Sequence, residues 1–418
     1  MAEPAVRHAE GTIPAPEPDL TPQEVIARAG AMRAKLLERQ AETEARAYYS
    51  EETHDEFTRA GFFRILAPRR FGGYEFDLTT YYKVMIALSR GCPSTGWQAC
   101  LAGAHCLQLG SYWNEQAQSD IFGPDGNFLA SMSQSFEGGS ATPVDGGYIL
   151  NGTWHYASGV PHATHHMGMV VRSDSDPSGP PDTVMAVIPR ESFTMLDDWG
   201  GLIGLKGSGS HSVRVENAFI PAHHVIPFGM FQDVENGTPG YRLHGNPMYA
   251  GQFMATALGT INSVQVGNAQ AVLDEYERLI TSRKTMAVGS VGILRYEDHD
   301  FQRCFGLAMS YIDAAESIVL RTGDLYLEYA RQSVEEGIPF SHEKVMRIYG
   351  QQMTAHKLCW EAGDLLFRTS SSSGAMDGTR MQRYWRDLSA MRANGLHQLD
   401  FRAPSIAQAH FGLPIRFL

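Results

Sequence analysis

The hydrophobic pattern of this chain changes period twice, and this change constrains the fold more than any other feature. Residues 21–125 show helical spacing. Residues from about 128 to 227 are rich in Gly, Ser, Thr, Val and His with short alternating runs, and helical spacing returns from about residue 252. A period of 3.6 is typical of amphipathic helices and a period of two is typical of half-buried strands. The order of helices, strands and helices predicts an α+β protein.

The first part of the chain is predicted to be helical. Thr21-Pro22-Gln23-Glu24 has the spacing of a capping box, with proline at the first helical position, and predicts a helix that extends to about Tyr49. Residues 1–20 are rich in Pro, Ala and Glu and are expected to form a flexible leader. Within an N-terminal helical domain of residues 21–125, further helices are expected over 51–60, 78–90 and 94–112.

The middle and last parts are predicted to differ in architecture. Residues 126–230 are expected to form a β-barrel or sandwich, with strands over 148–150, 183–188 and 212–215. Residues 231–418 are expected to form a helical bundle. Its long helices are predicted over 255–281, 298–332 and 341–368, with a last helix near 381–395.

Charge and cysteine content exclude several classes of function. The 34 Lys and Arg against 46 Asp and Glu give a net charge of −12, which argues against a nucleic-acid binder and against adhesion to anionic lipid. Five cysteines without a CxxC pair suggest neither a disulfide framework nor a zinc ribbon. The sequence shows no long apolar run and no signal-peptide pattern, so we expect a soluble cytoplasmic protein.

The glycine-rich run Gly204–Ser210 (GLKGSGS) does not match a nucleotide-binding motif. It is neither GxGxxG nor GxxxxGK[ST], and it leads into a strand-like run rather than a helix. We interpret it as a tight turn whose backbone can approach a flat ligand. Neither GxSxG nor HExxH is present, so the serine hydrolase and zinc peptidase classes lose their usual support.

The 16 histidines predict no metal site. The run His162-Ala163-Thr164-His165-His166 has no acidic partner at helical spacing, and His223 and His224, beside Pro221, are interpreted as structural. His105 differs, because it stands in a helix of small apolar residues where an imidazole needs a partner or a cavity. A core role and a functional role remain open for His105 and for His397, which follows a helix end.

Four strings, in order along nearly the whole chain, together resemble the acyl-CoA dehydrogenase superfamily. They are Pro68–Gly73 (PRRFGG), Leu150–Gly159 (LNGTWHYASG), Trp199 followed by Gly204–Ser210, and Gln382–Asp387 (QRYWRD). The resemblance implies an N-terminal helical domain, a middle β-barrel domain and a C-terminal four-helix bundle. It also implies a homotetramer built through that bundle.

Within this superfamily the chain is most similar to the oxygenase components of two-component flavin-dependent monooxygenases. The stretch after Asp387 lacks the Glu that serves as base in many dehydrogenases, and His397 lies there instead. The spacing of Trp97, His105 and Ser131 resembles that of the oxygenase of p-hydroxyphenylacetate hydroxylase. An oxygenase acting on nitrogen or sulfur, or an acyl-CoA dehydrogenase-like oxidase or dehydrogenase, remains an alternative.

The resemblance implies a mechanism with reduced flavin (FMNH2 or FADH2) and O2. A flavin C4a-(hydro)peroxide would hydroxylate a small aromatic, phenolic substrate, and a separate NAD(P)H:flavin reductase would supply the reduced flavin. His105 would act as base on the phenol, His397 would act on the peroxide proton, and Ser131 or Ser133 would hydrogen-bond the flavin. The division of work between the two histidines stays open.

The resemblance also implies which residues bind the cofactor. Trp97, with Trp154 and Ser158 from the β-domain, would line the flavin ring. Arg283 would meet flavin phosphate. The run of residues 370–374, with Ser372 and Gly374, would add donors to phosphate across a subunit boundary or would be only a flexible connector. Candidate walls of the substrate pocket are the helix of residues 97–105 and the stretch 245–253.

Overall fold

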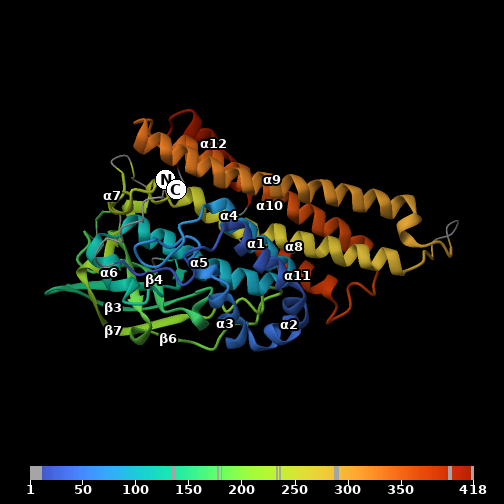
Figure 1. Ribbon diagram of the computed structural model, residues 1–418, viewed down its shortest axis with the longest axis horizontal. Coiled ribbons are helices and arrows are strands. Elements are labelled where there is room, and N and C mark those ends of the chain that lie inside the picture. The colour runs from blue at the N-terminus through green and yellow to red at the C-terminus, as the bar shows by residue number, and fades with distance from the viewer. Residues whose placement is uncertain are drawn as a thin grey trace, which may run out of the picture.

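The computed structural model describes residues 12–133, 135, 138–176, 178–179, 181–231, 234, 237–286, 291–393 and 398–415. Helices, strands and helices follow one another in the predicted order. The strands gather at one end of the molecule, and the long C-terminal helices run side by side along its upper edge (Figure 1). Within the described residues, no helix is long and apolar enough to cross a membrane.

The N-terminal helices confirm most of the predicted pattern. They are α1 (Pro22–Ala31), α2 (Arg33–Arg46), α3 (Glu51–Arg59), α4 (Leu78–Gly91), α5 (Pro93–Tyr112) and α6 (Glu115–Phe122). The capping box is present, since the Thr21 hydroxyl accepts from the N–H of Glu24 and the Glu24 carboxylate accepts from the N–H of Thr21. The single helix expected to Tyr49 is divided at Met32, and Ala47, in the left-handed region with φ 72°, ends its second part. Helix α6 was not predicted.

The leader is partly attached to the domain. Ile13 forms an isolated parallel bridge with Phe71, and Leu20 is buried. Residues 1–11 of the predicted leader lie outside the described residues.

The middle of the chain forms an eight-stranded mixed sheet among the described residues. Its strands are β1 (Ala130–Ser133), β2 (Gly139–Val144), β3 (Gly147–Trp154), β4 (His165–Arg172), β5 (Thr183–Pro189), β6 (Thr194–Met195), β7 (Val213–Pro221) and β8 (Val225–Pro227). The hydrogen-bonded order is β6-β7-β3-β2-β4-β5-β8, and β1 pairs with β4. All three predicted strands lie within or overlap β3, β5 and β7.

The strand order does not show the closed barrel that we expected. The path ends at β6 and β8, and the described pairings do not join these two strands. One edge of β4 is shared, because β1 runs parallel to its first half, from His165 to Gly168, while β2 pairs only with Val171 and Arg172. The strands therefore form an open sheet that splits along β4.

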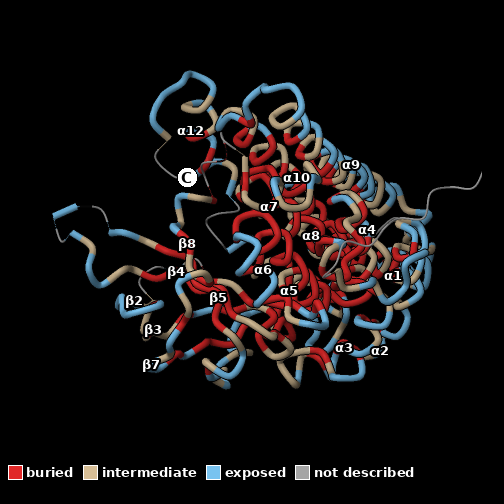
Figure 2. The backbone as a smooth tube through the Cα atoms, turned by 60° about the vertical axis from the view of Figure 1, so that its left-hand side comes forward, coloured by how far each residue is buried: buried red, intermediate tan, exposed pale blue. Residues whose placement is uncertain are grey.

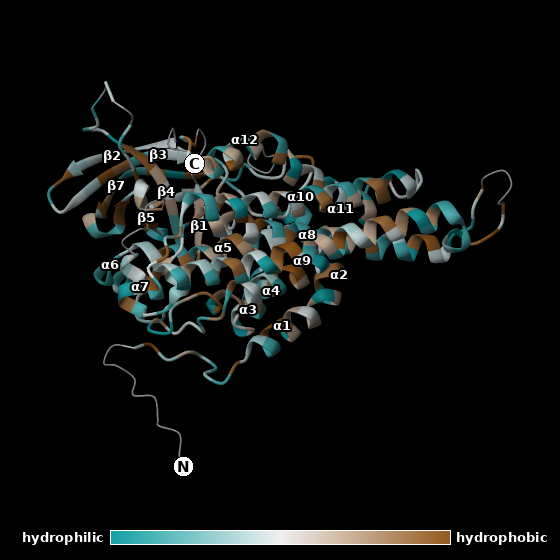
Figure 3. Cartoon of the chain, turned by 90° about the horizontal axis from the view of Figure 1, so that it is seen from above, coloured by the Kyte–Doolittle hydropathy of each residue, from teal (hydrophilic) through white to brown (hydrophobic). Residues whose placement is uncertain are grey.

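The C-terminal region is helical, as predicted. Its helices are α7 (Pro239–His244), α8 (Met254–Ser282), α9 (His299–Glu335), α10 (His342–Thr369), α11 (Arg380–Arg392) and α12 (Leu399–His410). Helices α8, α9 and α10 pack on one another, and α11 packs on α8 and α10. Hydrophobic and hydrophilic residues alternate along these helices (Figure 3). Ala308, Ile312, Ala315 and Val319 are buried on one face of α9, as their spacing predicts.

Helices α5 and α8 lie at the centre of the molecule. Almost every residue of α5 and most of α8 are buried, and both appear red in the middle of Figure 2. The two helices contact each other, and β1 packs against α5. The sheet, the N-terminal helices and the bundle therefore meet at α5.

Candidate active site

A cavity of about 780 Å³ lies where α5, β1 and the start of α8 meet. Helix α5 contributes one face to it, with Trp97, Leu101, Ala104, His105 and Gln108. The spacing of these residues, four and then three or four apart, places them along one side of a helix. The volume lies within the range of about 300–1,000 Å³ typical of small-molecule and cofactor sites.

His105 is the ionisable group that α5 brings to this cavity. Its side chain is buried, and its Nδ1 lies 2.6 Å from the backbone carbonyl oxygen of Ala130 in β1. Because a carbonyl oxygen only accepts, Nδ1 carries the proton and Nε2 of the neutral ring is left as an acceptor. Burial lowers the pKa of His105 to about 4, although the bond to Ala130 opposes this shift. The ring is therefore neutral near pH 7 and able to take up a proton.

A chain of hydroxyl groups lies on the sheet side of the cavity. The indole Nε1–H of Trp97 donates to Ser158 Oγ at 3.0 Å, Ser158 Oγ lies 2.7 Å from Ser210 Oγ, and Ser210 Oγ lies 2.8 Å from Ser208 Oγ. Trp97, Ser158 and Ser210 all line the cavity. The chain offers hydrogen-bonding groups beside a flat aromatic side chain, as a flavin ring requires.

His155 adds a second imidazole that the sequence interpretation missed. It lines the cavity, and its Nδ1 lies 2.6 Å from the hydroxyl of Ser212. That hydroxyl donates to a carboxylate oxygen of Asp198 at 2.5 Å, so its oxygen accepts from Nδ1–H of His155 and leaves Nε2 as the acceptor. Partial burial raises the pKa of Asp198, but its hydrogen bonds from Ser212 outweigh burial and lower it overall. The sequence could have indicated His155 as a cavity residue, because it lies between Trp154 and Ser158 in the recognised string.

The glycine-rich turn is held against the cavity by the QRYWRD string. The backbone N–H of Leu205 donates to Asp387 Oδ1 at 2.6 Å, and Arg386 donates to the carbonyl oxygen of Ile203 at 2.9 Å. A Cβ atom on Gly204 would lie 2.0 Å from the backbone oxygen of Arg386, so only glycine fits. Burial raises the pKa of Asp387 to about 7.

Arg386 also joins this turn to the N-terminal helices. Its guanidinium and that of Arg383 both pair with Glu44 of α2, each at 2.6 Å. Partial burial opposes ionisation of Glu44, but the two arginines outweigh it and lower its pKa.

We name the set of Glu44, Gly204, Leu205, Arg386 and Asp387 the turn clamp. The string is therefore structural support for the wall of the cavity formed by Leu202 and Leu205.

The two segments expected to form pocket walls both contribute residues to the cavity. The helix of residues 97–105 lines the cavity, and Phe253 lines it from the stretch 245–253. The start of α8 was missed and contributes Met254, Ala257, Leu258, Thr260 and Ile261. These side chains make that wall mostly apolar.

Two residues expected at the flavin lie outside the residues that line the cavity. Ser131 is fully buried, and its hydroxyl lies 2.9 Å from Nδ1 of His166 on the neighbouring strand β4. Trp154 is fully buried in the core of the sheet, where its Nε1–H donates to the carbonyl oxygen of Met169 at 2.9 Å. Ser133, two residues after Ser131, does line the cavity.

The residues that were expected to bind the flavin phosphate lie far from the cavity. Arg283 follows the last residue of α8 and donates to the hydroxyl of Ser373, beside Ser372 and Gly374. Ile261, the last α8 residue to line the cavity, stands 21 residues before the end of α8, which is about 30 Å along a helix. Within one chain, Arg283 and the cavity are therefore well separated along α8. His397 lies outside the described residues.

Comparisons with known proteins agree with this arrangement. Models of the acyl-CoA dehydrogenase N-terminal and C-terminal domains match residues 26–120 and 260–398. The flavin-dependent monooxygenase oxygenase subunit HsaA of Rhodococcus jostii (strain RHA1) is 31% identical over 93% of this chain and 98% of that protein. The p-hydroxyphenylacetate 3-hydroxylase oxygenase component of Acinetobacter baumannii is 25% identical over 84% of this chain and 81% of that protein.

A solved structure extends the agreement to the fold. The crystal structure of 3-HSA hydroxylase from Rhodococcus sp. RHA1 matches with a TM-score of 0.83 and 30% identity, covering 94% of this chain and 98% of that chain. Sequence and fold thus agree over nearly the full length of both proteins, and the resemblance stated from the motifs is confirmed. The chain belongs to the oxygenase components of flavin-dependent monooxygenases, which share the acyl-CoA dehydrogenase fold.

Proposed function

We propose that this oxygenase hydroxylates a small phenolic compound, using O2 and reduced flavin (FMNH2 or FADH2) from a separate NAD(P)H:flavin reductase. The observation that carries the proposal is the neutral His105, with Nδ1 engaged and Nε2 free to accept, in a cavity with a mostly apolar wall. The relative named p-hydroxyphenylacetate 3-hydroxylase acts on a phenol and supports this substrate class.

The residues of the cavity fit a flavin ring together with a small aromatic molecule. The volume of about 780 Å³ gives room for both, and Trp97, Ser133, Ser158 and Ser210 provide an aromatic face and hydroxyl groups to hold the flavin. When bound, the reduced flavin supplies the electrons that activate O2. Ser133 is a stronger candidate than Ser131 for the flavin contact, because Ser133 lines the cavity.

His105 would act on the substrate rather than on the flavin. A phenol whose hydroxyl donates to Nε2 of His105 becomes richer in electrons at the ring as its proton moves to the histidine. The apolar side chains of Leu101, Phe253 and Leu258 would exclude water from the reacting centre. His397 remains a predicted proton donor or acceptor for the oxygen atoms that come from O2.

We further propose a homotetramer in which Arg283, Ser372 and Gly374 hold flavin phosphate for a neighbouring chain. The separation of about 30 Å along α8 supports this arrangement, because these residues lie far from the cavity of their own chain. We also propose a cytoplasmic location. Its support is that all five cysteines are free and buried, as is typical of a reducing compartment.

The test uses matched substrates. The purified oxygenase is given chemically reduced flavin, isotope-labelled O2 and a panel of phenols, each paired with its methyl ether. We expect labelled oxygen in the product of at least one phenol and no conversion of its ether, because the ether has no proton for His105 to accept. Equal conversion of a phenol and its ether, or conversion only of nitrogen or sulfur compounds, would refute the proposal. Bleaching of a tightly bound flavin by an acyl thioester would instead show a dehydrogenase.

A further inference from the structure

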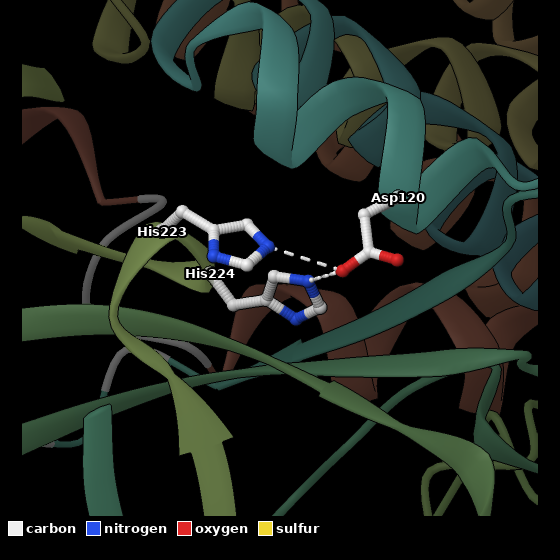
Figure 4. A group of neighbouring side chains, drawn as sticks. All are labelled: Asp120, His223 and His224. Carbon is white, nitrogen blue, oxygen red and sulfur yellow. Dashed lines mark hydrogen bonds and ion pairs between the residues drawn. The ribbon is translucent and has the colours of Figure 1, made fainter. Parts of the chain in front are cut away.

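Three side chains converge at the junction between the N-terminal helices and the sheet. Asp120 comes from α6, and His223 and His224 come from the 3-10 turn η5 (Ala222–His224) between β7 and β8. Nε2 of His223 lies 3.1 Å and Nε2 of His224 lies 2.7 Å from the same oxygen, Asp120 Oδ2 (Figure 4). The three ligand atoms lie within 4.8 Å of one another.

We propose that Asp120, His223 and His224 form a binding site for a divalent transition-metal ion of the zinc class. None of the three is among the described residues that line the cavity. The site is thus separate from the flavin chemistry, and it changes our sequence interpretation of His223 and His224 as purely structural.

The distances require little movement for an ion to bind. Zinc binds imidazole nitrogen and carboxylate oxygen at about 2.0–2.2 Å, so two tetrahedral ligands lie about 3.3 Å apart. The observed separations of 3.1 and 2.7 Å from Asp120 Oδ2 to the two nitrogens are shorter than this by about 0.2 and 0.6 Å. A small outward shift of the carboxylate therefore opens the space for the metal.

The hydrogen bonds within the group show which ring nitrogens a metal would use. A carboxylate oxygen only accepts, so Nε2–H of His223 and Nε2–H of His224 both donate to Asp120 Oδ2. Metal binding at Nε2 requires each ring to release that proton, either to solvent or to its own Nδ1.

Exposure gives an ion access from solvent. The side chain of Asp120 is 56% exposed, that of His223 22% and that of His224 8%. The buried histidine anchors the site, and the exposed side leaves a position for a water ligand. Two imidazoles favour Zn²⁺, Co²⁺ or Ni²⁺ over Mg²⁺ and Ca²⁺, which prefer oxygen ligands. A bound ion would join α6 to the turn between β7 and β8.

The test measures metal binding to the full chain without a polyhistidine tag. After removal of metal with a chelator, titration with Zn²⁺ is followed by calorimetry, and Co²⁺ is followed by its visible absorption. We expect one ion per chain, weakened at least tenfold in Asp120→Ala and in His223→Ala, because each variant loses a ligand. Mg²⁺ is expected to give no binding heat.

The matched control is His410→Ala. His410 lies 3.0 Å from Glu343, so it forms a histidine–carboxylate pair, but Arg347 rather than a second imidazole completes that group. This variant should bind zinc like the unaltered chain. The unfolding temperature without metal identifies variants that fail to fold, and zinc should raise it in the unaltered chain but not in Asp120→Ala. The proposal is overturned if the unaltered chain binds no zinc, or if His223→Ala binds it with unchanged stoichiometry and affinity.

Discussion

Replacing His105 by asparagine separates two contributions of the imidazole, which are the hydrogen bond from Nδ1–H to Ala130 and the acceptor nitrogen Nε2 in the cavity. The Asn amide N–H can take the place of Nδ1–H and donate to the Ala130 carbonyl, whereas nothing in Asn replaces Nε2 in the cavity. His105→Ala removes both. We expect both variants to lose hydroxylation and only the alanine variant to lose substantial stability.

The magnitudes follow from the two roles. A positioned base contributes about 100- to 10,000-fold to rate, so hydroxylation should fall at least about 100-fold in both variants. In His105→Ala the buried Ala130 carbonyl loses its donor, which costs about 1–3 kcal/mol of unfolding free energy. The folded pKa of His105 is about 4, below its ordinary value of 6.5. Stability is therefore complete above pH 6.5 and falls as pH drops toward 4, by about 1.4 kcal/mol at pH 5.5 from this residue.

The assay combines product formation, O2 uptake and denaturant unfolding at pH 7 and pH 5.5. With reduced flavin and a phenol, the variants should still consume O2 but release H2O2 in place of hydroxylated product. His105→Asn should lose less stability than the unaltered chain between pH 7 and pH 5.5. Hydroxylation at the unaltered rate in His105→Asn would refute the role of Nε2 as base.

Three other predictions concern the cavity wall. Asp387→Asn keeps the oxygen that accepts from the turn but removes a charge that burial disfavours. Because burial raises the pKa of the Asp387 carboxyl to about 7, the unaltered chain should lose about 1.4 kcal/mol of unfolding free energy as the pH rises from 6 to 8. Denaturant unfolding that shows an equal loss in Asp387→Asn would contradict this. Ser158→Ala breaks the hydroxyl chain from Trp97, so the Kd for reduced flavin in an anaerobic fluorescence titration should rise about 2- to 12-fold, with no change for an exposed serine of α9. Gly204→Ala places a Cβ atom against the backbone of Arg386 and should lower the unfolding free energy by about 1–3 kcal/mol. An unchanged thermal unfolding temperature would show that the turn can move to make room.

The sequence predicted the parts of the site that lie within one element or one string. Trp97 and His105 share a face of α5 because their spacing is helical, and Ser158 belongs to a recognised string. The long helices α8, α9 and α10 were predicted because their buried faces repeat over many turns. Short α6 and α12 were missed, since few turns leave little periodic signal.

The remaining parts depend on tertiary contacts that no local pattern reports. His155, the first residue after β3, lines the cavity, while its neighbour Trp154, the last residue of β3, enters the core. Ser131 and Ser133 stand two apart in β1, yet only Ser133 lines the cavity, and Ser131 meets His166 of β4. Both serines pair with β4, Ser131 opposite His166 and Ser133 opposite Gly168, and this pairing between distant segments is not encoded locally.

The turn clamp divides the cavity wall into positions of unequal mutational tolerance. Gly204 and Asp387 are held by backbone contacts, so most substitutions at these two positions should lower the free energy of unfolding. Leu202, which is 40% exposed and lines the same cavity, carries no such constraint. Directed evolution toward new substrates should therefore collect its accepted changes at positions such as 202, while the clamp stays unaltered and preserves the shape in which those changes act.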